Sequence, residues 1–240
     1  MSVLTLRLAG PLQSWGASAR FTRRTTESAP TKSGVIGMLA AAAGIQRGDD
    51  TALAPLAALH FGVRIDQPGT GVRDFHTAHH GVTGKSMPLS ERFYLADAVF
   101  VAALEGDPRL LTELNAALRA PVYPAFLGRR SCPPSLPVEL GLHPHGDLLD
   151  ALRTEPWQAS PWYRKHHRSQ DHVELTVLRE AHPDEHHTAD TLRDQPLSYA
   201  AEHRRHALRT RVTCSVRIPN PSARHLPRHD PFDALDEESA

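Results

Sequence analysis

The order of the predicted elements in the first half of the chain most constrains its fold. Val3–Leu8 has leucines at the alternate positions 4, 6 and 8, with the polar residues Thr5 and Arg7 between them and Val3 as an additional apolar residue. This pattern is typical of a strand, and Gly10-Pro11 ends it. The expected elements, in order, are a strand over 3–8, a helix over 34–43, a short helix over 52–59, a strand over 61–65, a strand over 93–104 and a helix over 109–119. Strand, helix, strand, strand, helix is most of a ferredoxin-like unit.

Two helix starts and one long polar segment refine this prediction. Ser33 is the expected N-cap of the first helix, and Asp107 is expected to cap the helix that follows Pro108. Residues 67–90 are rich in Gly, His and Thr and show no apolar period. Such a stretch is too long for a tight turn, so we expect an excursion from the core.

The second half of the chain is less regular. After Pro121 it is rich in Pro, His and Arg, and convincing strand patterns return only at 173–178 and 211–218. The predicted fold class is α+β, with a ferredoxin-like (RRM-like) domain that carries an inserted hairpin or loop and a smaller, irregular, β-containing C-terminal part packed on it. The predicted bounds are 1–125 for the domain, about 67–92 for the insertion, 126–219 for the smaller part and 220–240 for a disordered acidic tail.

Composition places the chain among globular proteins. It has 240 residues, 40% of them hydrophobic, and two cysteines far apart in sequence, which suits reduced thiols in the cytosol. The opening residues lack the basic-then-apolar order of a signal peptide. The longest apolar run, 35–45, is about half of the ~20 residues that a membrane span needs. We therefore expect a soluble, cytoplasmic protein that does not enter a membrane.

Charge is neutral overall but unevenly distributed. The chain has 27 basic and 27 acidic residues. Its first 32 residues carry Arg7, Arg20, Arg23, Arg24 and Lys32 against Glu27 alone. Residues 200–228 carry seven arginines against Glu202 alone. Local basic surfaces of this kind can hold a phosphate backbone, and solubilising surface charge is the open alternative.

Five motifs in a fixed order carry a family resemblance. They are LRLAGPLQSWG (6–16), PTKSGVIG (30–37), RDFHT (73–77), ERFYLAD (91–97) and YPAFLGRRSCP (123–133). With a weaker match at DQPL (194–197), they resemble the CasD family of the type I-E CRISPR Cascade complex. The resemblance covers roughly residues 3–137.

The resemblance implies a function. It implies an RNA-binding subunit of an antiviral ribonucleoprotein complex, gripping the 5′ repeat-derived handle of the guide RNA (crRNA). It implies Cascade backbone subunits and the large subunit as partners, with target DNA only an indirect partner. It implies that residues 69–90 form a thumb over the RNA, causing a kink at the first guide nucleotide. No catalytic residue, metal, cofactor or small-molecule substrate is expected.

The residues themselves suggest how RNA would be held. Trp15 can stack on an unpaired base at the rim of a sheet, although a core or hinge position is equally open. Lys32 and Ser33 stand at a helix N-terminus, which favours a phosphate unless they form an ordinary capping turn. Arg129 and Arg130 can bind phosphate or stack on a base, unless they are solvated surface residues. The other candidate RNA contacts are Arg20, Arg24, Arg73, His76, Arg92 and Ser131.

Other functions have weaker support. HGVTGKS (80–86) resembles the end of a Walker loop, but His79 replaces its first glycine. His182, His186 and His187 have spacing that can hold zinc, without a cysteine nearby. Relatives in the I-C subtype are metal-independent ribonucleases that process repeat RNA. His76 or His79 with Lys85 and Tyr94 is the corresponding alternative here. The remaining alternative to an RNA-binding subunit is a purely structural connector.

Overall fold

A seven-stranded antiparallel sheet forms the centre of the molecule. The computed structural model describes residues 1–17, 23–182, 185 and 189–224. The strands of this sheet are β1 (Ser2–Ala9), β4 (His60–Gln67), β7 (Val99–Gly106), β8 (Glu139–Pro144), β9 (His172–Glu180), β10 (Asp190–Ser198) and β11 (Arg205–Pro219). Their order across the sheet is β10-β11-β9-β4-β7-β1-β8.

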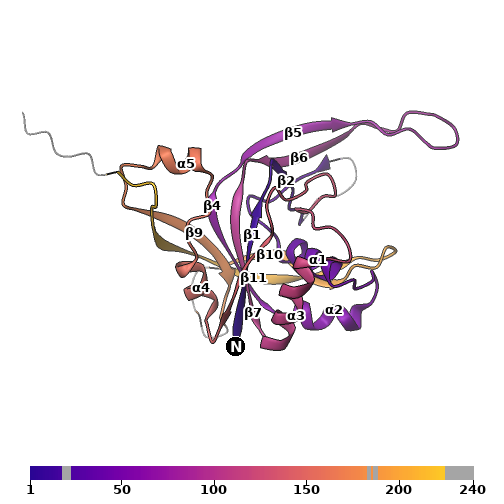
Figure 1. Ribbon diagram of the computed structural model, residues 1–240. Helices are drawn as coiled ribbons and strands as arrows, with labels where there is room; N and C mark the ends of the chain where they lie inside the picture. The colour runs from indigo at the N-terminus through magenta and orange to yellow at the C-terminus, as the bar shows by residue number, and fades with distance from the viewer. Residues whose placement is uncertain (18–22, 183–184, 186–188, 225–240) are drawn as a thin grey trace, which may run out of the picture.

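Helices cover both faces of this sheet. They are α1 (Lys32–Ala42), α2 (Asp50–Ala57), α3 (Pro108–Arg119), α4 (Leu148–Thr154) and α5 (Pro161–His166). Figure 1 shows α1, α2 and α3 on one side and α4 on the other. Within the described ranges, no helix combines the length and the apolar character required to cross a membrane.

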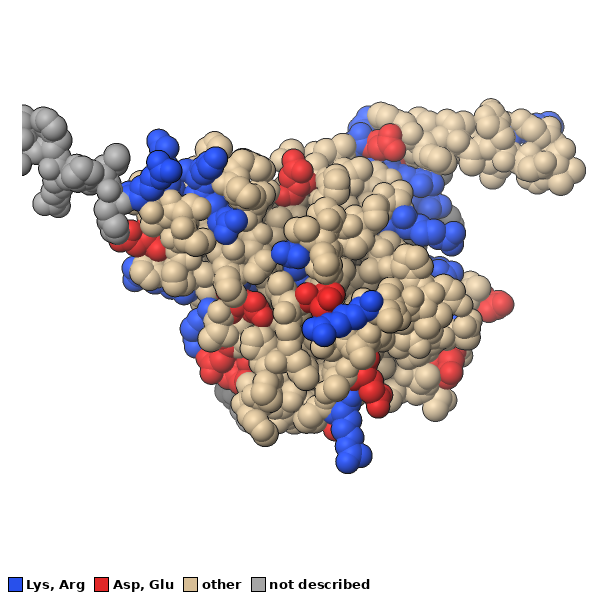
Figure 2. Space-filling view, in the orientation of Figure 1, with Lys and Arg blue, Asp and Glu red and all other residues tan. Residues whose placement is uncertain are grey.

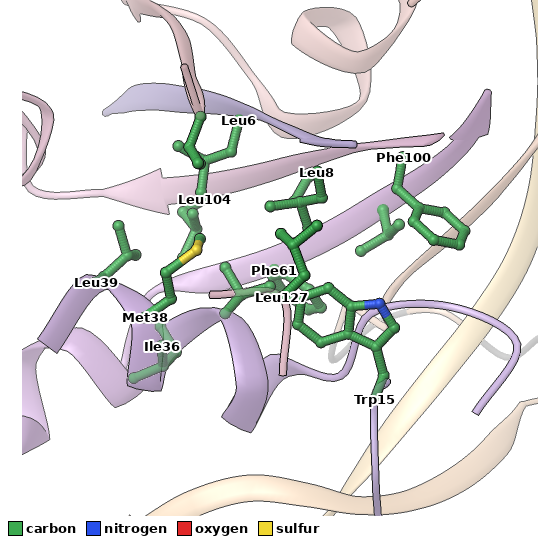
Figure 3. Close-up of a cluster of buried hydrophobic side chains, with 14 of the residues drawn as sticks. Leu6, Leu8, Trp15, Ile36, Met38, Leu39, Phe61, Phe100, Leu104 and Leu127 are labelled. Atoms are coloured by element: carbon green, nitrogen blue, oxygen red, sulfur yellow. The ribbon is translucent and has the colours of Figure 1, made fainter. Parts of the chain in front are cut away.

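Both faces of β1 are buried because its alternate residues enter two different cores. Leu4, Leu6 and Leu8 belong to the larger core, which also contains residues of α1 and α3 (Figure 3). Val3 points to the opposite side and belongs to the smaller core with residues of α4. Thr5 on that second side is fully buried. The alternating pattern therefore predicts the strand correctly. The face of β1 that carries Val3 and Thr5 is nevertheless buried, as the leucine face is.

The structure confirms one of the two predicted helix caps and corrects the other. Asp107 accepts a hydrogen bond from Leu110 N at 2.9 Å, as predicted for the cap of α3. The N-cap of α1 is Thr31, whose Oγ1 accepts from Gly34 N at 3.3 Å, so the prediction of Ser33 is wrong. Ser33 lies inside the first turn of α1.

The strand predicted over 93–104 is two strands in different sheets. A second sheet contains β2 (Leu12–Gln13), β3 (Arg23–Arg24), β5 (Thr70–His76) and β6 (Ser90–Ala96). Between β6 and β7 the chain turns at Asp97, which has a φ of 56° and donates its N–H to Pro11 O at 3.1 Å. Apolar residues on both sides of Asp97 concealed this break, because Leu95 and Ala98 are both buried.

The predicted excursion is a long hairpin, which we call the arm (residues 70–96). Its two strands pair from Thr70 opposite Ala96 to His76 opposite Ser90. Every residue of β5 and of the segment 77–89 is exposed. Figure 1 shows the arm projecting from the body. The Walker-like residues 80–86 lie in the connecting segment of the arm, where His79 and Ser86 form an isolated bridge.

The C-terminal part extends the central sheet. β8 lies beyond the predicted boundary at residue 125, yet it pairs with β1. β9 pairs with β4, and β10 and β11 continue from it. The predicted boundary therefore does not separate two sheets. Of the predicted tail, Asn220 is held by its N–H donating to Asp171 O at 2.7 Å, and residues 225–240 lie outside the described ranges.

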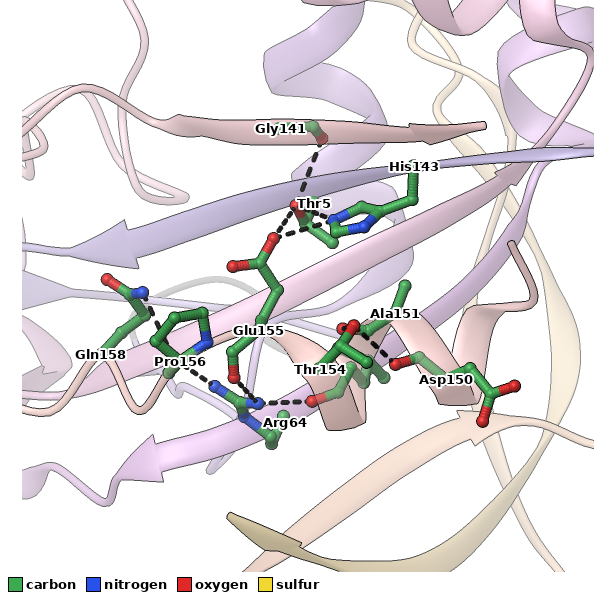
Figure 4. A network of polar contacts seen from close by, with 11 residues as sticks. Thr5, Arg64, Gly141, His143, Asp150, Ala151, Thr154, Glu155, Pro156 and Gln158 are labelled. Atoms are coloured by element: carbon green, nitrogen blue, oxygen red, sulfur yellow. Dashed lines mark hydrogen bonds and ion pairs between the residues drawn. The ribbon is translucent and has the colours of Figure 1, made fainter. Parts of the chain in front are cut away.

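A buried polar network fastens the segment after α4 to the sheet (Figure 4). Arg64 on β4 pairs with Asp66, with Nε 2.6 Å from Oδ1, and both side chains are fully buried. The same guanidinium donates to the carbonyls of Leu152, Glu155 and Pro156. These bonds position the chain that leads into α5.

Candidate nucleic-acid interface

The base of the arm gathers arginines from three strands and one turn. In the second sheet, β6 pairs with β3 on one side and β5 on the other. Arg24 and Asp74 both lie opposite Arg92, and Arg73 lies opposite Phe93. Directly opposite residues share a face of a sheet. Figure 2 shows Lys and Arg side chains gathered beside and below the base of the arm.

One face of this sheet carries Arg24, Arg92, Arg129 and Tyr94, and we call it the arginine face. Arg92 and Tyr94 are two residues apart on β6, so their side chains point the same way. The guanidinium of Arg129 lies 4.6 Å from the centre of the Tyr94 ring. Its Nη2 donates to the carbonyl of Arg24 at 2.8 Å. The stacked geometry holds the Arg129 cation in place.

The opposite face carries two further arginines on aromatic rings. Arg23 lies 5.3 Å from the centre of the Phe93 ring, and Arg73 lies 4.6 Å from that of Phe75. Glu91 is 3.9 Å from Arg23 and 3.8 Å from Arg73. One carboxylate thus lies between two guanidiniums. Both faces of the arm base are therefore basic.

The turn that presents Arg129 and Arg130 is fastened to the core. Leu127 N donates to Cys132 O at 2.7 Å, and Ser14 N donates to Leu127 O at 3.1 Å. Leu127 and Cys132 are buried, while Arg130 and Ser131 are exposed. Two adjacent arginines therefore lie on a fixed turn, which reduces the ordering cost of binding an anion.

Trp15 is a core residue, so the expected stacking on a base is wrong in this structure. Its ring is fully buried (Figure 3). Its Nε1 donates to Gln13 Oε1 at 3.0 Å. A Cβ on Gly34 would lie 2.8 Å from the Trp15 ring, so helix α1 approaches that ring closely. Burial leaves no free ring face for a nucleobase.

Lys32 and Ser33 are also not free to bind phosphate. Lys32 N donates to Asp194 Oδ2 at 2.8 Å, so a carboxylate of this chain occupies the N-terminus of α1. The Lys32 ammonium is 3% exposed and lies 2.8 Å from Glu180 Oε1. Ser33 is buried, and its carbonyl accepts a hydrogen bond from the Tyr199 hydroxyl at 2.5 Å. The N-terminus of α1 does bind an anionic group, as expected, but this group is the Asp194 carboxylate of the same chain.

Replacing Lys32 by methionine tests this correction. Methionine keeps most of the volume but leaves Glu180 without its shortest ion pair, although Arg209 remains 3.7 Å away. We expect the free energy of unfolding to fall by about 1–3 kcal/mol. Guide RNA bound per folded molecule should not change. Urea titration measures the first quantity, and RNA retention by the folded variant measures the second. If the Lys32→Met variant lost guide RNA while its stability stayed unchanged, the internal role of Lys32 would be contradicted.

The remaining predicted contacts divide into three groups. Arg24, Arg73 and Arg92 lie at the arm base with Arg129. His76 is exposed at the end of β5, farther along the arm. Arg20 lies outside the described residues. Sequence reasoning missed the supporting aromatic rings of Tyr94 and Phe93. Their alternation in ERFYLAD is the local signal that they face opposite sides of a strand.

The residues of the ribonuclease alternative lie at successive levels of the arm. Tyr94 pairs with Val72, His76 pairs with Ser90, and His79 bridges to Ser86. Four residues along a strand span ~13 Å, which separates the levels of Tyr94 and Ser90. Tyr94 is also 6% exposed. The described residues thus do not bring these groups to one ribose.

The three histidines whose spacing could hold zinc are divided by the described ranges. His182 is described, whereas His186 and His187 lie outside. Within the described part of the chain, no cluster of three or more His, Cys, Asp or Glu side chains could hold a metal ion.

Comparison with known proteins identifies the family. The profile of a family described as CRISPR-associated protein (Cas_Cas5) matches residues 3–212. The chain belongs to the Cas5 family. The CRISPR system Cascade subunit CasD of Escherichia coli (strain K12) is 38% identical to this Cas5 chain over 169 residues, covering 63% of the chain and 75% of that protein. The family resemblance carried by the five motifs is therefore confirmed.

Two solved structures resemble this Cas5 chain over almost its whole length. A crystal structure of a Cas protein has 34% sequence identity and a TM-score of 0.67, covering 94% of this chain and 99% of that one. A chain of a CRISPR RNA-guided surveillance complex has 31% identity and a TM-score of 0.71, covering 98% of each chain. The mixed α/β fold with antiparallel sheets is thus shared with these Cas structures.

Proposed function

We propose that this chain is the non-catalytic Cas5 subunit of a cytoplasmic type I-E Cascade complex and holds the 5′ repeat-derived handle of the guide RNA. In this role it caps the filament of backbone subunits beside the large subunit. The names of the E. coli relative and of the similar surveillance complex support the assembly. The observation that carries the RNA-binding role is the arginine face, with Arg129 held on Tyr94 beside Arg24 and Arg92.

The arm base as a whole suits a phosphate backbone better than a small ligand. Six arginines lie at the arm base and its adjoining turn against two acidic residues, Asp74 and Glu91. The six are Arg23, Arg24, Arg73, Arg92, Arg129 and Arg130. Guanidinium groups bind phosphate oxygens in a fork geometry and position the strand without reading its sequence. The excess of positive charge attracts RNA.

The arm and the central sheet complete the proposal. The chain order β1, α1, β4, β7, α3, β8, with adjacent strands β8-β1-β7-β4, supports a ferredoxin-like unit from which the arm projects. The arm joins this unit next to the arginine face. We infer that it is the thumb that covers the RNA and bends it at the first guide nucleotide. Its exposed Val82, Met87 and Leu89 are suited to contact a neighbouring backbone subunit.

Replacing Arg129 and Arg130 together by alanine tests the RNA-binding role. The tagged chain is co-expressed with a CRISPR array and its sibling subunits, purified, and the 5′ ends of the retained RNA are sequenced. We expect the natural chain to retain guides with one uniform repeat-derived 5′ end. The double variant should lose most of this RNA, because it removes two guanidiniums to which this proposal assigns phosphate contacts.

The matched control is Arg47→Ala with Arg109→Ala, which removes the same charge from exposed positions outside the arm base. This control should retain guide RNA as the natural chain does. Unchanged RNA in the Arg129/Arg130 variant, with siblings still bound, would support a structural connector instead. Absence of both RNA and siblings from the natural chain would overturn the Cascade role.

Cleavage assays test the non-catalytic part of the proposal. Purified chain is incubated with CRISPR repeat RNA in the presence of EDTA. We expect intact RNA, since His76, His79 and Tyr94 lie at different levels of the arm. Metal-independent cutting that a His76→Ala variant abolishes would show that the chain is a ribonuclease.

A further inference from the structure

A second basic surface lies around α5, apart from the arm. Figures 1 and 2 show α5 and nearby Lys and Arg side chains on the other side of the body from the arm. We call this surface the α5 patch, and its residues are Trp162, Arg164, Lys165, Arg168 and Arg224. Trp162 is 52% exposed, and Lys165, Arg168 and Arg224 are exposed as well.

Within the part of the chain that the structure describes, no carboxylate pairs with the cations of the α5 patch. In the described ranges, Arg164, Lys165, Arg168 and Arg224 form no ion pair, whereas other surface arginines do, such as Arg153 with Asp150 at 2.5 Å. From residue 156 to residue 173 Asp171 is the single acidic residue, against three Lys and Arg. Unpaired cations concentrated on one surface attract a polyanion.

The backbone under the patch is fixed from both directions. Ser160 N donates to Gln67 Oε1 at 3.0 Å, directly before α5. Asn220, itself buried, donates its Nδ2 to His167 O at 2.8 Å. Arg224 N donates to Arg168 O at 2.9 Å. The loop is thus ordered before any ligand arrives, which lowers the entropic cost of binding.

An aromatic layer supports the exposed indole. Trp157 is buried and makes ring contacts with Tyr163 and His167 at 6.1 and 5.8 Å. Trp162 contacts Tyr163 and His166 edge-on, with interplanar angles of 87° and 88°. These contacts hold Trp162 in place while half of it stays exposed. An exposed aromatic ring among cations offers stacking for an unpaired base and ion pairs for its phosphates.

We propose that the α5 patch binds a single-stranded nucleic acid, with a base stacked on Trp162 and phosphates on Arg164, Lys165 and Arg168. A duplex keeps its base faces covered and would leave the exposed indole without a partner. An acidic protein would use the cations without needing the ring. This surface is separate from the arginine face, so the proposal does not rest on handle binding.

Fluorescence anisotropy with labelled dT15 and rU15 tests the proposal on the purified full chain. The triple variant Arg164→Gln, Lys165→Gln, Arg168→Gln should weaken binding. Its plot of log K against log salt should become shallower by about 2, since each phosphate contact on a single strand contributes ~0.7. Trp162→Ala should weaken binding by about fivefold or more. Binding of either oligonucleotide that weakens in both variants supports the proposal, and tighter binding of dT15 or of rU15 shows which of the two strands the patch prefers.

The matched control removes three cations elsewhere, by Arg47→Gln, Arg109→Gln and Arg119→Gln. Its affinity should stay near that of the natural chain. Intrinsic fluorescence gives an independent readout, because Trp15 and Trp157 are buried and Trp162 is the exposed tryptophan. Emission should fall when the oligonucleotide binds to the natural chain.

Three outcomes would overturn the proposal. They are unchanged affinity of the triple variant, unchanged Trp162 emission on binding, and an equal loss in the control. Equally tight binding of a polyglutamate peptide, lost in the same triple variant, would assign the patch to an acidic protein instead. Guide RNA retained by the co-expressed complex should be the same with and without the triple substitution, which separates this test from that of the arginine face.

Discussion

Replacing Arg64 by leucine is expected to lower the free energy of unfolding by about 3–5 kcal/mol. Arg64 and Asp66 are both fully buried, and leucine leaves the Asp66 carboxylate without its cation. The substitution also removes the donors to the Glu155 and Pro156 carbonyls, at 2.7 and 2.9 Å. Urea unfolding followed by circular dichroism measures the loss.

The Arg64→Leu substitution should first loosen one segment of the chain, the one that follows α4. The Arg64 network holds the segment that includes Trp157, whose Nε1 donates to Asp66 O at 2.8 Å. We therefore expect the α5 segment to become more sensitive to proteases in the Arg64→Leu variant. The double variant Arg64→Leu, Asp66→Leu removes both charges and should regain part of the stability. A loss below about 1 kcal/mol in the single variant would contradict the importance of this pair.

The stability loss should depend on pH. Burial raises the pKa of Asp66 above its ordinary value of 3.8, and Arg64 opposes this rise. Leucine at position 64 removes the opposition, so the folded-state pKa of Asp66 rises further. A carboxyl with a raised folded-state pKa favours folding while protonated, and this contribution is lost as pH rises through that pKa. The stability difference from the natural chain should therefore shrink as pH falls through that pKa, which urea unfolding at a series of pH values measures.

Replacing Gly128 by alanine is expected to displace the turn that carries Arg129 and Arg130. Gly128 has a φ of 82°, which costs a residue with a side chain about 1–3 kcal/mol. A Cβ there would also lie 1.8 Å from the Ser14 carbonyl oxygen, so the turn must move away from the core. We expect a stability loss above about 2 kcal/mol. Guide RNA retention should fall with it, because Arg129 leaves the Tyr94 ring.

Gly84→Ala provides the matched control for this prediction. Gly84 has a φ of 66°, but no atom lies within 4 Å of the position its Cβ would take. The control therefore includes the backbone strain without the steric clash. Its stability loss should be clearly smaller than that of Gly128→Ala. Equal losses in the two variants would show that backbone strain alone accounts for the effect and that the turn does not have to move.

Local patterns were sufficient to predict much of the fold and the family. The alternation of Val3–Leu8 predicted β1, and Asp107-Pro108 predicted the start of α3, because both depend on neighbours within a few residues. The polar stretch after Gln67 predicted that the chain leaves the core. The motifs ERFYLAD and LGRRS placed Arg92, Arg129 and Arg130 among the candidates, and their family resemblance is confirmed.

Only the tertiary structure decided which of these side chains are free to bind a ligand. Trp15 and Lys32 have the chemistry of RNA contacts, but one is enclosed by the core and the other pairs with Glu180, which is 148 residues away. Asp194 reaches Lys32 N from 162 residues away. Burial and ion pairing at such separations depend on how strands meet in the sheet. A local sequence pattern records the chemistry of a side chain but not the partner that the fold brings to it.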